Sequence, residues 1–172
     1  MYYAAGTLDA PGAMFTASHN PAGYNGVKFC LSGARPVGVD TGLDEVKRVA
    51  GDVLEGHGPL PAATAGSQTS RNLLEAFADH VVSFVDVASL RALRVVADTA
   101  NGMGGLVVPA VFERLPQITL EVMYGELDGT FPNHPADPLQ PANQRDLQAR
   151  VVAGGEIGSA QSKGAAATAR PA

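Results

Sequence analysis

The sequence is poor in charged residues, contains one cysteine and contains no tryptophan. Charged side chains make up 17% of its 172 residues, the net charge is −5, and Lys and Arg form no cluster, which argues against nucleic acid as a partner. The single cysteine, Cys30, cannot form a disulfide within the chain, and this fits a reducing compartment. Because Cys30 lies in an apolar run, we expect a small buried side chain rather than a reactive thiol.

Long hydrophobic runs are also missing. No apolar stretch approaches the roughly 20 residues that a membrane-spanning helix needs, and the first residues lack the basic region and apolar core of a signal peptide. We therefore expect a cytoplasmic protein without a membrane partner. Hydrophobic residues nevertheless form 45% of the chain, which is enough for a buried core and too much for general disorder.

The apolar periodicity changes along the chain. Before residue 88 it predicts short strands and amphipathic helices, at 13–17, 27–32, 42–55 and 71–87. After residue 93 it alternates between strand and helix, at 94–98, 106–115, 118–124 and 143–153. This alternation predicts an α/β layered fold with a domain boundary near 88–93, so that the domains span 1–89 and 90–157. Residues 158–172 are small and polar without periodicity, which predicts a disordered tail.

The stretch TASHNP, residues 16–21, carries the strongest functional signal. It places Ser18 and His19 on a tight loop rich in turn formers, residues 16–26, which we call the serine loop. A serine can carry a phosphoryl group where the developing charge is neutralised by backbone N–H groups or by a divalent cation. Because neighbouring residues of an extended chain point to opposite sides, we expect His19 to be poorly placed to take the Ser18 proton. No Gly-x-Ser-x-Gly pattern surrounds Ser18 either, so a Ser-His-Asp hydrolase is disfavoured.

Other polar residues leave two interpretations open. His19 can contact a phosphate or hydroxyl, or it can stabilise the loop. Lys28, which opens an apolar strand, can extend to solvent, or it can face the serine loop and move a proton or hold a sugar phosphate. The turn at 101–105 can bind a phosphate, although a structural turn braced by Asp98 is favoured. His134, in a long loop with scattered acids, is weak evidence for a metal site.

Three stretches together resemble the α-D-phosphohexomutases, the phosphoglucomutase and phosphomannomutase family. They are TASHNPAGYNGVK at 16–28, VVADTANGMGG at 95–105 and DGTFPNHPADPLQPAN at 128–143. The resemblance implies three-layer α/β/α domains, both incomplete: the end of a first domain, and the start of a second domain. It also implies phosphoryl transfer between the C1 and C6 oxygens of a hexose phosphate, through a hexose 1,6-bisphosphate.

The resemblance assigns a role to each residue of the predicted site. Ser18 is expected to carry the phosphoryl group and, through that phosphate, to be a ligand of Mg²⁺. His19 and Lys28 are expected to line the reaction centre, with Lys28 as a candidate for proton transfer. Positioning and charge neutralisation would then supply most of the rate enhancement.

The sequence departs from the family pattern after Ile157. The acidic metal-binding loop expected there is replaced by SAQSKGAAATARPA, and the sugar-binding and phosphate-binding loops of later domains are missing. We interpret this change as a shifted reading frame or a truncated gene, and we expect the second domain to lose a core strand and to expose a sheet edge. Two hypotheses follow: an incompletely represented phosphohexomutase, or a truncated fragment without catalytic activity.

Overall fold

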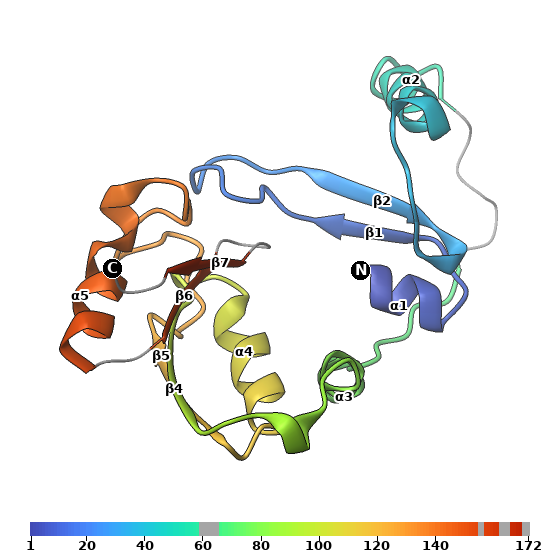
Figure 1. Cartoon of the computed structure of the whole chain (residues 1–172). Helices are drawn as coiled ribbons and strands as arrows, with labels where there is room; N and C mark the ends of the chain where they lie inside the picture. Colours follow the sequence, from blue (N-terminus) through green and yellow to red (C-terminus); the bar gives the residue numbers. More distant parts are fainter. Residues whose placement is uncertain (59–65, 155–156, 162–165, 170–172) are drawn as a thin grey trace. The chain divides into compact units, whose positions relative to one another are not determined.

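The computed structural model describes four ranges of the chain, residues 1–58, 66–154, 157–161 and 166–169. The chain is mixed α/β and divides into two compact units, each with its own sheet (Figure 1). Unit 1 comprises Met1–Phe15 and Val27–Asn72. Unit 2 comprises Thr16–Gly26 and Leu73–Ala172. The serine loop therefore groups with unit 2, although the two strands that it joins belong to unit 1.

Unit 1 is built on a three-stranded antiparallel sheet in the order β1-β2-β3. Its elements are α1 (Tyr2–Thr7), β1 (Gly12–Phe15), β2 (Val27–Leu31), η1 (Ser32–Ala34), β3 (Arg35–Pro36), η2 (Val39–Thr41) and α2 (Leu43–Leu54). The first helix was not predicted, because six residues without a side-chain cap give no periodic signal. Cys30 on β2 is 2% exposed, which confirms the expectation of a buried thiol.

The helix α2 confirms the predicted helix within a residue at each end, but its apolar face is only partly covered. No residue of α2 is buried, and Leu54 is 88% exposed. The helix is held on its polar side by Arg48, which pairs with Glu45 and Asp52 one turn away on either side. Periodicity therefore predicted the helix correctly without predicting what it packs against.

Unit 2 contains a four-stranded sheet in the order β5-β4-β6-β7. The strand β4 pairs in parallel with both of its neighbours, while β6 and β7 pair antiparallel. The elements are α3 (Leu74–Val82), η3 (Val87–Ser89), β4 (Leu93–Asp98), α4 (Gly104–Phe112), β5 (Ile118–Met123), η4 (Pro141–Gln144), α5 (Arg145–Gly154), β6 (Ile157–Gln161) and β7 (Ala166–Ala169). The predicted alternation of strand and helix is confirmed.

The core of unit 2 lies between β4 and α5. Val96 and Leu147 are fully buried, Val151 is almost so, and Met123 packs against this cluster. The residues of β4 from Val95 onward are all buried, as expected of a central parallel strand that is covered on both faces. The sheet and α5 thus fix the position of the end of β4, where Asp98 lies.

The tail differs from the sequence prediction. Residues 158–172 were predicted to be disordered, whereas the structure has β6 and β7 at 157–161 and 166–169. Backbone hydrogen bonds to β4 require no side-chain pattern, and so small residues can form these strands without giving a periodic signal. We expected the second domain to lose a core strand and to expose a sheet edge, and in the described residues β6 pairs with β4. The rest of the tail lies outside the described residues. The compact units separate at residues 72 and 73, and the boundary near 88–93 stays a prediction.

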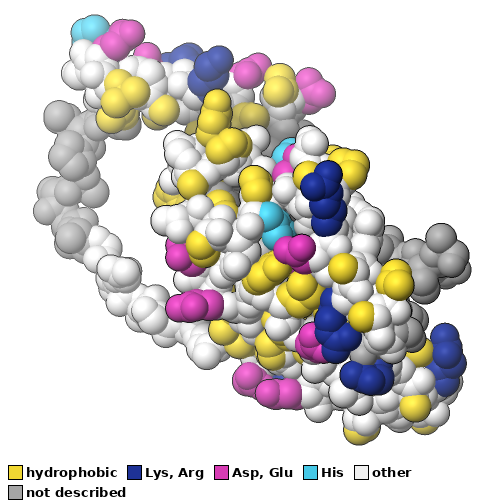
Figure 2. Space-filling model, turned by 90° about the vertical axis from the view of Figure 1, so that its left-hand side faces the viewer, with side chains coloured by type: hydrophobic (Ala, Val, Ile, Leu, Met, Phe, Trp, Pro, Cys, Tyr) yellow, Lys and Arg dark blue, Asp and Glu magenta, His cyan; other side chains and the backbone are white. Residues whose placement is uncertain are grey.

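The described helices and surface add two observations on possible partners. Within the described residues, no helix is both long enough and apolar enough to cross a membrane. On the face that Figure 2 shows, Lys and Arg side chains lie in several separate places, some of them beside Asp or Glu.

Candidate active site at the serine loop and the strand ends

The serine loop is closed by hydrogen bonds at its base and within its turns. The Thr16 N–H donates to the Gly26 carbonyl at 2.9 Å, and the Asn20 N–H donates to the Ala17 carbonyl at 3.0 Å. Gly26 is required where it stands, because a Cβ atom there would lie 2.9 Å from the Thr16 carbonyl oxygen. The sequence prediction of a tight loop at this place is confirmed.

Ser18 has a left-handed backbone, with φ of +55°. Residues other than Gly and Asn adopt this backbone conformation rarely, and it costs of the order of 1 kcal/mol or more. The surroundings hold it there: the Ser18 N–H donates to Thr16 Oγ1 at 3.1 Å, and the residue is half-buried. Such local strain is typical of functional sites, where it fixes the direction of a reactive side chain.

The left-handed turn also brings Ser18 and His19 together, contrary to the sequence expectation. Ser18 Oγ and His19 Nδ1 lie 3.3 Å apart, at the long end of hydrogen-bonding distance. The expectation assumed an extended chain, and it fails because φ at Ser18 is positive. His19 is exposed. Among the described residues its contacts include no carboxylate that would orient it as in a hydrolase triad, so the pair alone does not make a Ser-His-Asp site.

Lys28 lies on β2 in unit 1, paired across the sheet with Met14 of β1. Its side chain is exposed, which is compatible with both interpretations of this residue. Since Ser18 belongs to unit 2, the role of Lys28 beside the serine stays a prediction.

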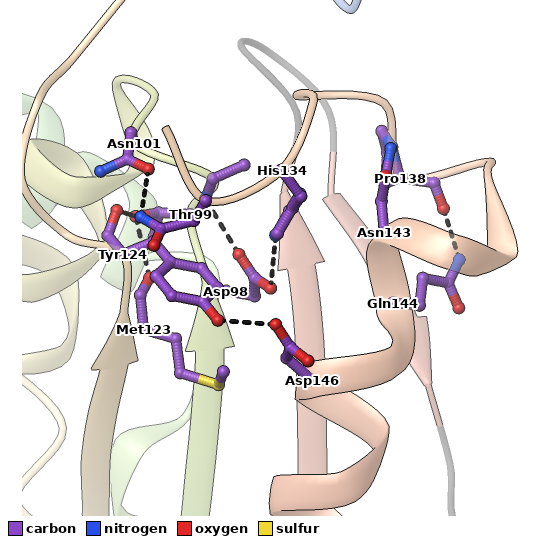
Figure 3. A network of polar contacts seen from close by, with 12 residues as sticks. Asp98, Thr99, Asn101, Met123, Tyr124, His134, Pro138, Asn143, Gln144 and Asp146 are labelled. Carbon is purple, nitrogen blue, oxygen red and sulfur yellow. Dashed lines mark hydrogen bonds and ion pairs between the residues drawn. The ribbon is translucent and has the colours of Figure 1, made fainter. Parts of the chain in front are cut away.

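A second group of polar residues gathers at the carboxyl end of β4 (Figure 3). Asp98 is 1% exposed, and its Oδ1 accepts a hydrogen bond from the Ala100 N–H at 3.0 Å. The Asp98 carboxylate thus braces the turn that follows the strand, as the sequence predicted. Thr99, fully buried, donates from Oγ1 to the carbonyl of Tyr124 at 2.9 Å and so ties the ends of β4 and β5 together. In parallel α/β sheets this is the edge at which ligands usually bind.

His134 completes the group from the long loop after β5. Its Nε2 lies 3.0 Å from Asp98 Oδ2, and its side chain is 14% exposed. The histidine was predicted only as part of an ordered connecting loop. The structure shows that it contacts Asp98, 36 residues earlier in the chain, rather than the acids close to it in sequence.

Tyr124, Asp146 and Asn133 are members of this network that sequence reasoning missed. The Tyr124 hydroxyl donates to Asp146 Oδ2 at 2.8 Å, and its ring packs edge-on against the ring of His134. The hydrogen bond to Asp146, together with burial and the negative charges of Asp146 and Asp98, raises the pKa of Tyr124 to about 12. One signal was available: Tyr124 ends the predicted strand beside the one that Asp98 ends.

The hydrogen bonds of the turn after β4 go to the protein's own backbone. The backbone N–H groups of Asn101, Gly102 and Gly105 donate to carbonyl groups of the protein itself, so they are not free to receive a phosphate. Gly105 is required for close packing, because a Cβ atom there would lie 2.0 Å from the Gly125 carbonyl oxygen. These contacts agree with the favoured interpretation of the turn.

The acidic side chains of the described residues do not converge on a site for Mg²⁺. Within the ranges that the structure describes, no group of three or more His, Cys, Asp or Glu side chains comes together as a metal ion would need. Asp98 is committed to His134 and to the turn, and Asp128 accepts both hydrogen bonds of Thr130, which lower the pKa of Asp128. The described donor set therefore does not form a Mg²⁺ site, and the predicted metal stays a prediction based on the resemblance.

Family models match most of the chain. Residues 1–51 match the model described as phosphoglucomutase/phosphomannomutase, alpha/beta/alpha domain I, and residues 75–160 match that of alpha/beta/alpha domain II.

Curated relatives share this description. A phosphomannomutase of Salmonella montevideo is 36% identical over 159 residues, which are 88% of this chain and 34% of the relative. A protein of Xanthomonas campestris pv. campestris named phosphohexose mutases is 40% identical over 144 residues, covering 83% of this chain and 31% of the relative. A phosphoglucomutase of Neisseria gonorrhoeae is 35% identical over 162 residues, 93% of this chain and 33% of the relative. The chain thus spans about a third of the length of these relatives.

Solved structures agree in fold. A putative phosphomannomutase from Thermus thermophilus superimposes with a TM-score of 0.77 at 23% identity, over 99% of this chain and 39% of that one. A phosphoglucomutase/phosphomannomutase family protein from Burkholderia thailandensis gives a TM-score of 0.68 at 24% identity, over 91% of this chain and 34% of that one.

Proposed function

Because the chain belongs to the phosphoglucomutase/phosphomannomutase family, we propose that Ser18 carries a phosphoryl group between the C1 and C6 oxygens of a hexose phosphate. The observation that carries this proposal is the backbone of Ser18. A non-glycine residue held at φ of +55° on a closed loop has its Cα–Cβ bond in a fixed direction, and its hydroxyl lies 3.3 Å from His19 Nδ1. Preorganisation of this kind is what a phosphoryl carrier needs, because positioning supplies much of the rate.

The proposed cycle starts from phosphorylated Ser18 and a hexose monophosphate. An oxygen of a sugar hydroxyl forms a bond to phosphorus while the bond between phosphorus and Ser18 Oγ breaks, and this gives hexose 1,6-bisphosphate. The proton leaves the sugar hydroxyl and a proton returns to Ser18 Oγ. After the bisphosphate has turned round, Ser18 takes the other phosphoryl group by the reverse of these steps, so that atoms and charge balance over the cycle.

His19 and Lys28 are the proposed groups for the protons and for charge. His19 Nδ1 lies 3.3 Å from Ser18 Oγ, close enough to exchange a proton with it. Lys28 in its neutral form is the candidate to accept the proton of the sugar hydroxyl, and as a cation it can bind phosphate. Mg²⁺ belongs to the proposal through the family alone: bound through the Ser18 phosphate, it would neutralise negative charge on the phosphoryl group. The proposed setting is the cytoplasm.

A second candidate function is phosphate binding without turnover. It is favoured by one observation, the lack of a converging acidic group among the described residues. Without such a group, the serine loop would bind a sugar phosphate weakly and would not exchange phosphoryl groups with it.

Intact-mass measurement separates the two functions. The full chain is incubated with glucose 1,6-bisphosphate or mannose 1,6-bisphosphate, with Mg²⁺ and with a chelator in parallel. Phosphoryl transfer predicts a gain of one phosphoryl group per chain that maps to Ser18. This gain is absent from Ser18→Ala and retained in Ser32→Ala, a serine of η1 in unit 1. If the folded wild type gains no mass with either sugar, the phosphoryl-carrier function is rejected for this chain.

A further inference from the structure

Asp98 pairs with a residue of a loop that is distant from it in the sequence. Besides bracing the turn through Oδ1, it meets His134 Nε2 with Oδ2 at 3.0 Å. A carboxylate that is 1% exposed needs such partners, because an unpaired buried charge is strongly unfavourable. Because an unpaired Asp98 would be unfavourable, its pair with His134 keeps that residue and its loop at the end of β4.

Both nitrogens of the His134 ring face oxygen atoms. Nε2 faces the Asp98 carboxylate, and Nδ1 lies 2.9 Å from the carbonyl oxygen of the next residue, Pro135. The carbonyl oxygen and the carboxylate oxygen can each accept a hydrogen bond, so each ring nitrogen has a partner on the protein. His134 then links the end of β4 to the backbone of its own loop, with the Tyr124 ring packed against its side.

A second set of hydrogen bonds attaches the same loop next to this pair. Asn101 Nδ2 donates to the Glu126 carbonyl at 2.9 Å, and Asn101 Oδ1 accepts from Asn133 Nδ2 at 2.8 Å. The Asp128 N–H donates to the Asn101 carbonyl at 3.0 Å. Residues 126–134 are thus attached to the end of β4 at both of their ends, by side chains that are buried on the β4 side.

Backbone strain concentrates in the same place. Ala100, Tyr124 and Phe131 all have positive φ, between 46° and 54°. Three such residues in the segments joined at the end of β4 persist only where the surrounding contacts impose them, and strain of this kind is characteristic of sites that must hold a fixed shape.

We propose that His134 is a positioning residue: through its pair with Asp98 it orders residues 126–134 as part of the surface that holds the serine loop in place. The serine loop belongs to the same compact unit, and Figure 1 draws both segments toward the end of the unit at which β4 finishes. The functional part of this proposal rests on the proposed phosphoryl transfer at Ser18. The structural part does not depend on that function and is tested by hydrogen exchange.

The structural part is tested by hydrogen exchange of the full chain with His134→Ala and His134→Gln. The amides to follow are those of Asn20 and Tyr24 in the serine loop, which are hydrogen-bonded within it. His134→Ala is expected to speed their exchange at least several-fold, together with the exchange of residues 126–134. His134→Gln, which can still donate to Asp98, is expected to restore part of the protection. His57→Ala is the matched control, because that side chain is 77% exposed.

The functional part is the rate at which Ser18 gains a phosphoryl group from the bisphosphate. This rate is expected to fall about tenfold or more in His134→Ala, because a small misplacement of a reactive group lowers the rate strongly. It is expected to recover partly in His134→Gln. If residues 126–134 loosen while the serine loop keeps its protection, the positioning role is overturned. If wild type is never phosphorylated, the proposed function fails, and the exchange result still decides whether His134 holds the serine loop.

Discussion

The helices α2 and α5 were both predicted as amphipathic from the sequence, and they have different surroundings. In unit 2, α5 buries Leu147 and Val151 against β4, and these side chains form the core. In unit 1, α2 buries no residue, and its apolar side chains include Val53 at 53% and Leu54 at 88% exposure. An apolar stripe therefore identifies a helix, whereas only tertiary packing decides whether that stripe stabilises the fold.

Arg48 of unit 1 and Asp98 of unit 2 show the same contrast. In unit 1 the ion pairs of Arg48 lie on the exposed side of α2. In unit 2 the carboxylate of Asp98 is buried and bonded on both oxygens. Exposed pairs contribute little to stability, while a buried group is costly once a partner is lost. We therefore expect substitutions in unit 2 to have the larger effects.

The largest expected effect is that of Leu147→Ala. Removing a fully buried leucine in a core leaves a cavity, and the free energy of unfolding should fall by about 3 kcal/mol. The matched change in unit 1, Leu54→Ala, should alter it by no more than about 0.5 kcal/mol. Urea unfolding followed by circular dichroism measures both. Equal losses at the two positions would mean that α2 is buried in solution, and the contrast between the helices would disappear.

Asp98→Ala comes next. It removes the partner of His134 and the brace of the turn after β4, and we expect a loss of about 2–3 kcal/mol in the free energy of unfolding. Asp52→Ala on α2 is the counterpart in unit 1 and should have little effect, because its pair with Arg48 is exposed. The same urea experiment measures both, and a neutral Asp98→Ala would show that the buried pair is not stabilising.

Tyr124→Phe is expected to have a smaller effect, of about 1 kcal/mol, through loss of the hydrogen bond to Asp146. It also has a pH signature. The pKa of Tyr124 is raised from 10.0 to about 12 in the folded chain. The stabilisation is therefore complete below pH 10 and is lost as the pH rises toward 12, because the unfolded chain releases this proton first.

Thermal unfolding of wild type and Tyr124→Phe between pH 9 and pH 12 tests that signature. The difference in stability between the two proteins should shrink over this range. Tyr24→Phe in the serine loop is the control, since that side chain is 64% exposed. A difference that stays constant to pH 12 would contradict the hydrogen bond between Tyr124 and Asp146.

The comparison also shows what the sequence could and could not predict. The strands and helices from residue 93 to residue 154 were predicted nearly to their ends, because the periodicity of β4, α4, β5 and α5 reflects the core that they share. The contact between Asp98 and His134 could not be predicted, because it joins residues 36 positions apart through the path of a loop. The strands β6 and β7 were missed since small residues pair by backbone alone.

At the serine loop, the sequence pointed to candidate residues but not to their geometry. The motif identified Ser18 and His19, and the assumption of an extended chain then separated their side chains wrongly, because nothing in the local pattern indicates that φ at Ser18 is positive. Strained backbone conformations are imposed by the surrounding contacts, so a local sequence pattern does not predict them.

The smallest effect that we expect is a gain. At a positive φ, glycine avoids the steric cost that Ser18 bears, so Ser18→Gly should raise the free energy of unfolding by about 0.5 kcal/mol, whereas Ser18→Ala keeps the strained backbone and loses only the contact with His19. Urea unfolding of the three proteins in parallel measures the difference, with Ser32→Gly as the control for glycine itself. Ser18→Gly and Ser18→Ala both lack the hydroxyl that is proposed to carry the phosphoryl group. A gain in stability with a loss of function would then occur at the same residue. A Ser18→Gly protein less stable than Ser18→Ala would mean that the left-handed turn is not strained, and the structural argument for Ser18 as the carrier would lose its basis.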